Sequence, residues 1–467
     1  MKFNIFSLII AALLFMTSCE DTLEQRLSDS VEVGNAITDI TSLNLAANGS
    51  YSLFASSDNY NRSFMLLPEI MSDNAFIDAF DNTGRYLDYD NYGVNATDVY
   101  ANGLWNNLNS IIATTSIIIR QANLIDFPET VQDEANQYVG EMYTLRALAF
   151  HNYQLLFSQP YNFTSDASHL GVPIPDFDLL GDGNNVQFPS RSSTSVVYQQ
   201  ITSDLQAAIP LLQDNSSPFR IDVSAAKGLL ARVFLHMERW EEARDLATDV
   251  IINSGNELLE NQEYLGSWSL DSNSETIFTL VNNETDNSGT NSIGYFYLTY
   301  EDAFASDEFK NIFSDSDIRK QLYPADGSVN LITKFPKVEI QDDNIQVVRL
   351  SEMYLIKAEA HAQLSEYTEA QQALDMIIQR ADPSVVIPST ETGQDLINKI
   401  LLERRKELAF EGFRLFDLTR YGLTFNKYRQ DADPIVISAP ENRTILPIPI
   451  DEINVNPNIA DQQNPGY

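Results

Sequence analysis

The sequence predicts a mainly α-helical protein, a scaffold of tetratricopeptide-like helical repeats that carries a large, irregular, loop-rich insertion. Apolar residues recur at three- and four-residue spacing over long stretches, which is typical of amphipathic helices. No comparable series of alternating strands with hairpin signals occurs, so an all-β sandwich is excluded. The 467 residues, of which 43% are hydrophobic, suffice to bury a large core.

Four long helices are expected in the first half of the chain. Their periodic segments cover residues 36–55, 98–125, 129–157 and 193–213. Pro128 stands just before the third segment as a helix-start signal, and Ser and Thr residues stand at the start of the fourth. The one tryptophan inside these patterns, Trp105, is expected in the core. We treat residues 36–467 as a single domain.

Two later stretches, residues 193–255 and 349–382, contain similar helical pairs. Small residues stand twelve positions apart in both, Ala231 with Ala243 and Ala358 with Ala370. This is the spacing at which two antiparallel helices of a tetratricopeptide repeat cross closely. Ordinary helical hairpins are the alternative, because the repeat signature is incomplete.

The stretch between these pairs, residues 262–345, has a different composition. Asn, Asp, Ser, Thr and Gly surround aromatic residues there, and a shorter stretch at residues 71–95 has the same character. Long structured loops on a rigid helical scaffold are common places for binding surfaces. We therefore expect the ligand-binding region in these loops.

A further helix is predicted over residues 394–411, closed by a left-handed cap at Gly412. Arg404 falls on its apolar stripe, and a buried arginine must be paired. The acidic candidates nearby in sequence are Glu403, Glu407, Glu411 and Asp417.

Composition excludes several classes of function. The 29 Lys and Arg residues stand against 66 Asp and Glu residues, a formal net charge of −37. This disfavours nucleic acid and weakly favours neutral over anionic ligands. The four histidines lack close metal-ligand spacing, and no nucleophile elbow, phosphate loop or dinucleotide fingerprint occurs. We predict no enzyme activity, no cofactor and no metal site, with one alternative left open: a structural calcium ion at the oxygen-rich residues 176–184.

The N-terminus has the pattern of a secretion signal. A basic Lys2 precedes an apolar run over residues 5–16, which is too short for the ~20 residues that a transmembrane helix needs. Small residues then precede Cys19, the only cysteine of the chain. Residues 16–19 resemble a bacterial lipobox, which implies a signal peptide over 1–18, an acylated Cys19 and an acidic linker over 19–35. An ordinary cleaved signal with an incidental cysteine is the alternative.

Several segments resemble one known family. Residues 403–422, ERRKELAFEGFRLFDLTRYG, are similar to the signature of SusD/RagB-type nutrient-binding lipoproteins, and residues 140–150, 349–360 and 446–458 also look like segments of that family. The resemblance implies a lipid-anchored protein of the outer membrane, at the cell surface, that binds an oligosaccharide or polysaccharide. It also implies a partner, a SusC-like TonB-dependent transporter, for which the protein acts as a lid. A peptide-binding or purely structural lid is the alternative.

A glycan site needs exposed aromatic rings that stack on sugar C–H faces, with polar side chains that bind the hydroxyls. We expect the loops at 71–95 and 262–323 to meet and form this site. For each ring alone, a packing role is the alternative. The candidate residues are Asp73, Asn74, Tyr86, Tyr89, Trp268, Tyr295, Tyr297 and Tyr300.

Overall fold

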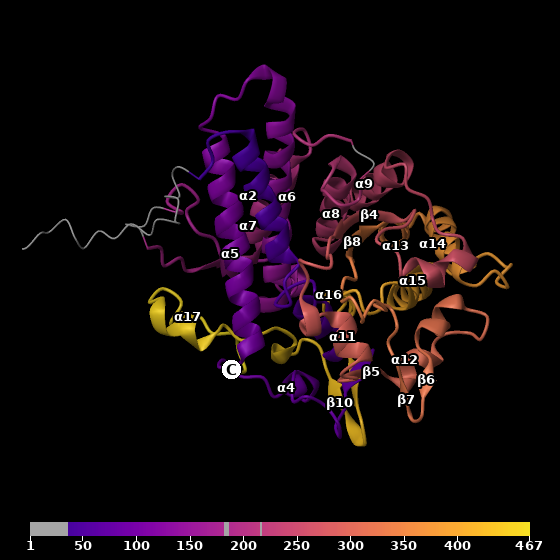
Figure 1. The fold of residues 1–467 in the computed structure, drawn as a ribbon. Helices are drawn as coiled ribbons and strands as arrows, with labels where there is room; N and C mark the ends of the chain where they lie inside the picture. The colour runs from indigo at the N-terminus through magenta and orange to yellow at the C-terminus, as the bar shows by residue number, and fades with distance from the viewer. Residues whose placement is uncertain (1–35, 182–185, 215–216) are drawn as a thin grey trace, which may run out of the picture. The chain divides into compact units, whose positions relative to one another are not determined.

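The computed structural model describes residues 36–181, 186–214 and 217–467 (Figure 1). The predicted signal peptide, Cys19 and the acidic linker lie outside the described residues, as does part of the stretch 176–184. In the described ranges, no helix is long and apolar enough to cross a membrane. The same ranges contain no cluster of three or more His, Cys, Asp or Glu residues that could hold a metal ion.

Four helices of the first half pack against one another, which confirms the predicted segments. They are α2 (Ile40–Phe54), α5 (Val99–Ala122), α6 (Gln132–Phe157) and α7 (Thr194–Ala208). Side-chain caps define where these helices begin: Asp39 accepts from the Ser42 amide, Asp98 from the Ala101 amide and Ser193 from the Val196 amide. Trp105 is buried between α5 and α6, as expected.

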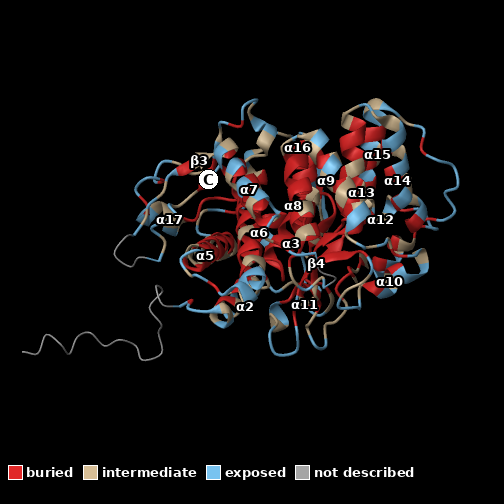
Figure 2. Ribbon diagram, turned by 90° about the horizontal axis from the view of Figure 1, so that it is seen from above, coloured by how far each residue is buried: buried red, intermediate tan, exposed pale blue. Residues whose placement is uncertain are grey.

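Two helical hairpins follow in the stretches where helical pairs are predicted. They are α8 (Val223–His236) with α9 (Trp240–Asn253), and α13 (Leu350–Gln363) with α14 (Tyr367–Ala381). Helix α9 packs along α13, so the two hairpins stack. The four alanines at twelve-residue spacing are all fully buried. Their small side chains let the axes of the paired helices approach closely. Figure 2 shows that buried residues predominate along α6 and α8.

The stretch 262–345 is built from short elements, as expected for an irregular insertion. They are α10 (Tyr264–Ser267), β4 (Thr276–Leu280), α11 (Ile293–Leu298), β5 (Ala303–Ala305), α12 (Asp307–Asn311), β6 (Ala325–Asp326) and β7 (Val329–Asn330). Strand β8 (Ile345–Arg349) returns antiparallel to β4 and leads into α13.

The other helices and strands include α15 (Gly393–Glu407), which packs against α13 and α14, and several short elements. The short elements are α3 (Ser63–Ile70), β1 (Ala75–Ile77), α4 (Leu87–Asp90), β2 (Leu170–Pro173), β3 (Arg191–Ser193), α16 (Arg414–Arg420), β9 (Phe425–Arg429), β10 (Ala432–Ile437) and α17 (Ile450–Val455). The largest sheet has the strand order β1-β5-β7-β6. Strands β2 with β3, and β9 with β10, form antiparallel pairs.

Helix α15 ends at Glu407, so the prediction of a helix to residue 411 with Gly412 as its cap is wrong. The carbonyl of Glu407 accepts from Arg349 Nη2 at 2.7 Å and is not used by a helical amide. Phe410 then takes a positive φ of 63°, which breaks the helical path. The local sequence favours a helix to residue 411, but the hydrogen bond from the buried Arg349 to the Glu407 carbonyl ends α15 earlier.

The predicted pairing of Arg404 is confirmed. Its Nε lies 3.1 Å from Asp417 and 3.7 Å from Glu359, and all three side chains are buried. The other three acidic candidates pair elsewhere: Glu403 and Glu407 with Arg319, and Glu411 with Arg349. These buried ion pairs link α15 and the residues that follow it to η7 (Ile318–Leu322), β8 and α14.

Candidate functional site

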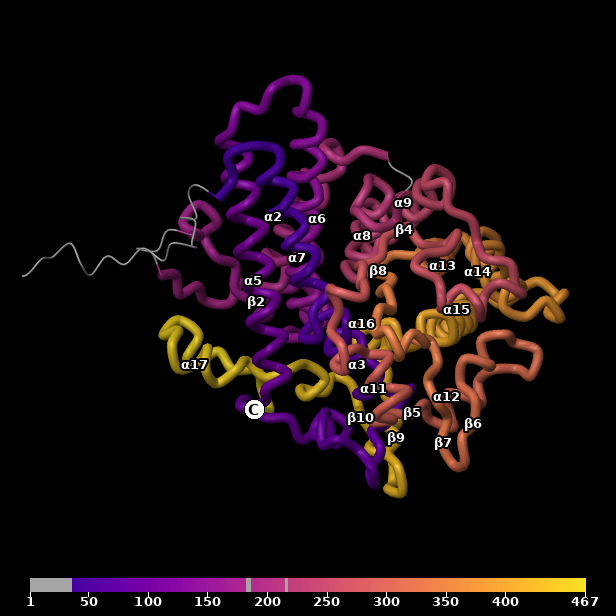
Figure 3. Tube along the Cα trace, viewed as in Figure 1, coloured from indigo at the N-terminus to yellow at the C-terminus, as the bar shows by residue number. Residues whose placement is uncertain are grey.

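The two predicted binding loops meet, as expected. Strand β1 from the first loop runs antiparallel to β5 from the second, with Phe76 opposite Phe304. The amide of Thr83 donates to Asp302 Oδ1 at 2.8 Å, and the Thr83 hydroxyl donates to the other oxygen of the same carboxylate. In Figure 3 the segments around α4, β5 and α11 lie together beside the β9–β10 hairpin. A single surface is therefore formed by chain segments more than 200 positions apart.

Aromatic rings gather where these loops meet. We call this group the tyrosine cluster and define it as Tyr86, Tyr100, Tyr295, Phe296 and Tyr300. Tyr86 stacks on Tyr100 with ring centroids 3.9 Å apart and meets the edge of Phe296 at 5.6 Å. Tyr295 and Tyr300 are in edge contact at 4.9 Å. Tyr100, Tyr295 and Tyr300 are half-buried, whereas Tyr86 and Phe296 are buried.

Arg85 joins the two halves of the tyrosine cluster. Its guanidinium carbon lies 4.4 Å from the Tyr300 ring centroid and 5.8 Å from that of Phe296. Its Nε donates to Thr83 Oγ1 at 2.9 Å and lies 3.8 Å from Asp302. The cation is thus held flat against aromatic faces, where the ring quadrupole attracts it.

Sequence reasoning missed Arg85 and Tyr100. Arg85 precedes the predicted Tyr86, and its basic character in an acidic chain was an available signal. Tyr100 lies in the first turn of α5, two positions after the cap residue Asp98. A residue in a first turn projects next to the incoming loop, but the pattern marked it only as helical.

Three predicted rings are buried, so the expectation that they are exposed is wrong. Tyr86 is only 2% exposed because its hydroxyl bonds with Arg62 Nε and Ser63 Oγ, both at 2.8 Å; burial raises its pKa to about 12. Tyr89 is fully buried and donates to Asp98. Tyr297 is fully buried against Phe335 and Phe410. These three tyrosines are packed in the interior and fix the loops to the scaffold.

Asp73 and Asn74 are also buried, in contact with the C-terminal signature. Asp73 receives both Arg414 Nε and Nη2 at 2.7 Å, and Asn74 accepts from Arg405 Nε at 2.8 Å. Burial alone would raise the pKa of Asp73, but hydrogen bonds and charge from Arg414, with the charge of Arg405, hold it below its ordinary value. Both residues fix the start of the first loop to the scaffold.

Trp268 lies apart from the tyrosine cluster, at the end of α10. Lys334 Nζ lies 4.2 Å from the centroid of its indole, and the adjoining cavity has a volume of about 10 Å³. That is room for about one water molecule. Lys334 therefore covers one face of the Trp268 indole. Of the predicted aromatics, Trp268, Tyr295 and Tyr300 are half-buried and not buried, and a glycan contact by any of them stays a prediction.

Comparisons with known proteins agree with the motifs. A family model described as "SusD family" matches residues 329–467, and one described as "Starch-binding associating with outer membrane" matches residues 25–235. The chain is a SusD/RagB family protein. This confirms the resemblance found in the sequence. Members of this family are non-catalytic binding proteins, which agrees with the prediction that the chain is not an enzyme.

Individual relatives of this SusD/RagB protein match over nearly their whole length. A SusD-like protein of Formosa agariphila, P2, is 24% identical over 98% of both chains. A SusD superfamily structure from Bacteroides thetaiotaomicron superposes with a TM-score of 0.83 at 28% identity, covering 92% of this chain and all of that one. A Bacteroides vulgatus structure, for which sugar binding is suggested, has the same TM-score at 27% identity and covers 92% of this chain and 99% of its own. The mainly helical fold class is thereby confirmed.

Proposed function

We propose that this SusD/RagB protein captures neutral oligosaccharides or polysaccharides at the cell surface, anchored in the outer membrane through Cys19. It delivers them to a SusC-like TonB-dependent transporter. The observation that carries the proposal is the tyrosine cluster, where Tyr100, Tyr295 and Tyr300 are only half-buried and Tyr295 contacts Tyr300. A family model described as starch-binding and a relative for which sugar binding is suggested support the same class of ligand.

The chemistry of the cluster suits a neutral sugar. Aromatic faces bury the apolar C–H face of a sugar ring, and polar groups at the edge satisfy its hydroxyls. Arg85 supplies guanidinium N–H donors beside Tyr300. The net charge of −37 opposes polyanionic glycans at long range.

The test is a binding screen of the mature chain lacking Cys19 against neutral and anionic polysaccharides, by affinity gel and then calorimetry. For the retained glycan, Tyr300→Ala and Tyr295→Ala should each weaken binding tenfold or more, which equals ~1.4 kcal/mol. Tyr367→Ala is the matched control, because Tyr367 is also half-buried but lies on α14. Unchanged affinity in both cluster variants would contradict the assigned site. Retention of peptides and no glycan would favour the peptide-binding alternative.

The anchor and the partner are tested separately. Cys19→Ala should move the protein from the membrane fraction to the soluble fraction of cells, while the fold remains. The SusC-like transporter should co-purify with the wild-type chain from detergent extracts. Recovery of Cys19→Ala in the membrane fraction of cells that lack the transporter would contradict the lipid anchor.

A further inference from the structure

A second cavity lies outside the tyrosine cluster. It has a volume of about 420 Å³, and none of its lining residues belongs to that cluster. Three segments enclose it: η4 (Tyr161–Phe163) with the residues before it, the end of α16 with the turn after it, and the base of the β9–β10 hairpin with the following loop. Its volume lies in the range of small-molecule sites, roughly 300–1,000 Å³.

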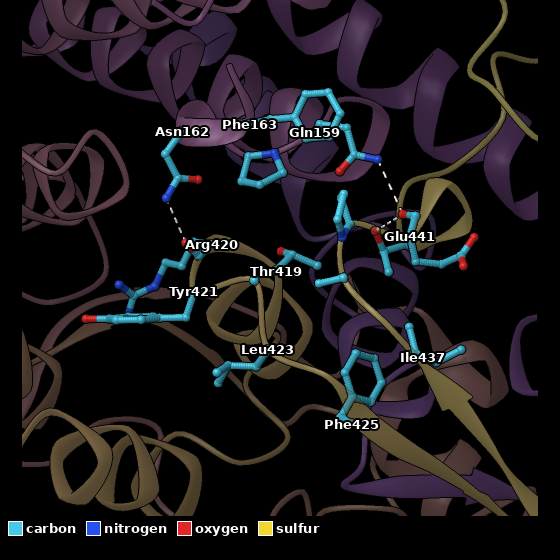
Figure 4. Close-up of a pocket in the computed structure, with 15 residues that line it drawn as sticks. Gln159, Asn162, Phe163, Thr419, Arg420, Tyr421, Leu423, Phe425, Ile437 and Glu441 are labelled. Atoms are coloured by element: carbon cyan, nitrogen blue, oxygen red, sulfur yellow. Dashed lines mark hydrogen bonds between the residues drawn. The ribbon is translucent and has the colours of Figure 1, made fainter. Parts of the chain in front are cut away.

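The walls of this cavity combine apolar and polar side chains, and the apolar ones form two facing parts. Figure 4 shows Phe163 on one side and Leu423, Phe425 and Ile437 on the other. Phe163 is 43% exposed and Leu423 is 37% exposed, although side chains of this size are usually covered. The exposed faces of an aromatic ring and a leucine thus meet in one concave space, which is the arrangement that an apolar ligand face would cover.

Polar groups stand at the edge of the same space and hold it open. Asn162 Nδ2 donates to the Arg420 carbonyl at 2.8 Å and to Glu238 at 2.7 Å, and Gln159 Nε2 donates to the Glu441 carbonyl at 3.4 Å (Figure 4). These bonds join the segments that enclose the cavity, so the cavity is formed before any ligand arrives. The amide oxygens of Gln159 and Asn162 remain as acceptors for hydroxyl donors, whereas the carboxylate of Glu441 accepts from the Arg443 amide at 3.2 Å.

The charge of the cavity excludes an anion. Of the described residues that line it, Arg420 is the one cation, and its guanidinium is buried in ion pairs with Glu359 and Asp417. Glu441 is the one acid among these lining residues. A ligand with hydroxyl donors and no negative charge therefore fits both the walls and the edge.

We infer that this cavity is a second carbohydrate site, which takes one neutral sugar ring with its C–H face on Phe163. The hydroxyls of that ring donate to the amide oxygens of Gln159 and Asn162. The inference shares with the proposed function only the class of ligand, because no residue is common to the two sites. Two sites on one chain would also raise the avidity for a long glycan.

Three variants test the inference. Leu423→Trp fills the cavity from its edge and leaves the core untouched, and Phe163→Ala removes the stacking face. Phe188→Ala is the matched control, because Phe188 is 41% exposed and does not line the cavity. Unfolding temperatures equal to that of the wild type confirm that each variant folds.

The probes are glucose, galactose, mannose, xylose, maltose and cellobiose. Binding of each sugar to the protein is measured by saturation-transfer NMR and by calorimetry. For a sugar that binds, Leu423→Trp should reduce the number of sites from two to one, Phe163→Ala should weaken the same site tenfold or more, and Phe188→Ala should change neither. The Tyr295→Ala/Tyr300→Ala double variant should keep the cavity site.

The outcomes separate the two proposals. If the double variant loses all binding while Leu423→Trp and Phe163→Ala lose none, the inference is overturned and the proposed function stands. If the cavity variants lose binding and the double variant does not, the inference stands and the tyrosine cluster is wrongly assigned. Binding of no probe sugar at millimolar concentration, or binding of phenylalanine dipeptides alone in the cavity, overturns the inference as well.

Discussion

The carboxylate of Glu407 is the centre of the buried ion-pair network, and its replacement by Gln is expected to destabilise the fold strongly. Glu407 Oε1 lies 2.7 Å from Arg349 and 2.6 Å from Arg380, and Oε2 lies 2.9 Å from Arg319. Burial alone would raise the pKa of Glu407, but the charges of Arg380, Arg349 and Arg319 outweigh burial and hold this pKa well below its ordinary value.

The size of the effect follows from these three contacts. The Gln side chain keeps one oxygen that can accept from Arg349 and Arg380. Neither hydrogen bond is then charge-assisted, which lowers the free energy of unfolding by about 1 kcal/mol for each bond. The new amide NH₂ faces a donor of Arg319, so that bond is lost at a cost of ~2 kcal/mol. The sum, about 4 kcal/mol, lies in the usual range for breaking a buried ion pair, roughly 3–5 kcal/mol.

The assay is urea unfolding of the mature chain, followed by far-ultraviolet circular dichroism. Glu391→Gln is the matched control, because Glu391 pairs with Lys399 at 2.9 Å while 38% of its side chain is exposed. An exposed pair of this kind contributes at most ~1 kcal/mol. A Glu407→Gln variant as stable as Glu391→Gln would refute the reasoning and show that water or rearranged side chains compensate for the lost charge.

Two further predictions concern pH and packing. Burial lowers the pKa of His151 to about 3, and burial with the neighbouring His151 lowers that of His236 well below its ordinary value. Both are neutral in the fold but take up protons when the chain unfolds, so stability falls as the pH drops below ~6.5; at pH 5 His151 alone accounts for ~2 kcal/mol. His151→Gln should reduce the difference in unfolding free energy between pH 7.5 and pH 5 by that amount, and an equal difference in both proteins would count against this origin. Gly294→Ala should cost ~1–3 kcal/mol, because its Cβ would lie 2.6 Å from the Phe335 carbonyl oxygen. Gly49→Ala meets nothing within 4 Å in α2 and should be neutral or stabilising by up to ~1 kcal/mol in the same unfolding assay, so equal unfolding midpoints for the two alanine variants would contradict the clash.

The helices could be predicted from the sequence because their signals are local. The apolar spacing of α5 and α6 and the cap residue Ser193 involve neighbours within one or two turns, and the alanine pairs of the hairpins lie only twelve positions apart. The signature at residues 403–422 likewise identified the family, and it required Arg404 to be paired. Its acidic neighbours Glu403, Glu407 and Glu411 turned out to bind arginines from η7, β8 and α14.

The tertiary structure alone decided which loop side chains face solvent. Tyr86 and Tyr300 both lie in loops that the sequence marks as aromatic and polar, yet Tyr86 is buried with its hydroxyl bonded to Arg62 and Ser63, while Tyr300 is half-buried. The end of α15 and the cavity beside Phe163 also depend on residues far away in the chain. The physical reason is the range of the forces: helix propensity and caps act over a few residues, whereas burial and ion pairing depend on whichever distant segments packing brings together.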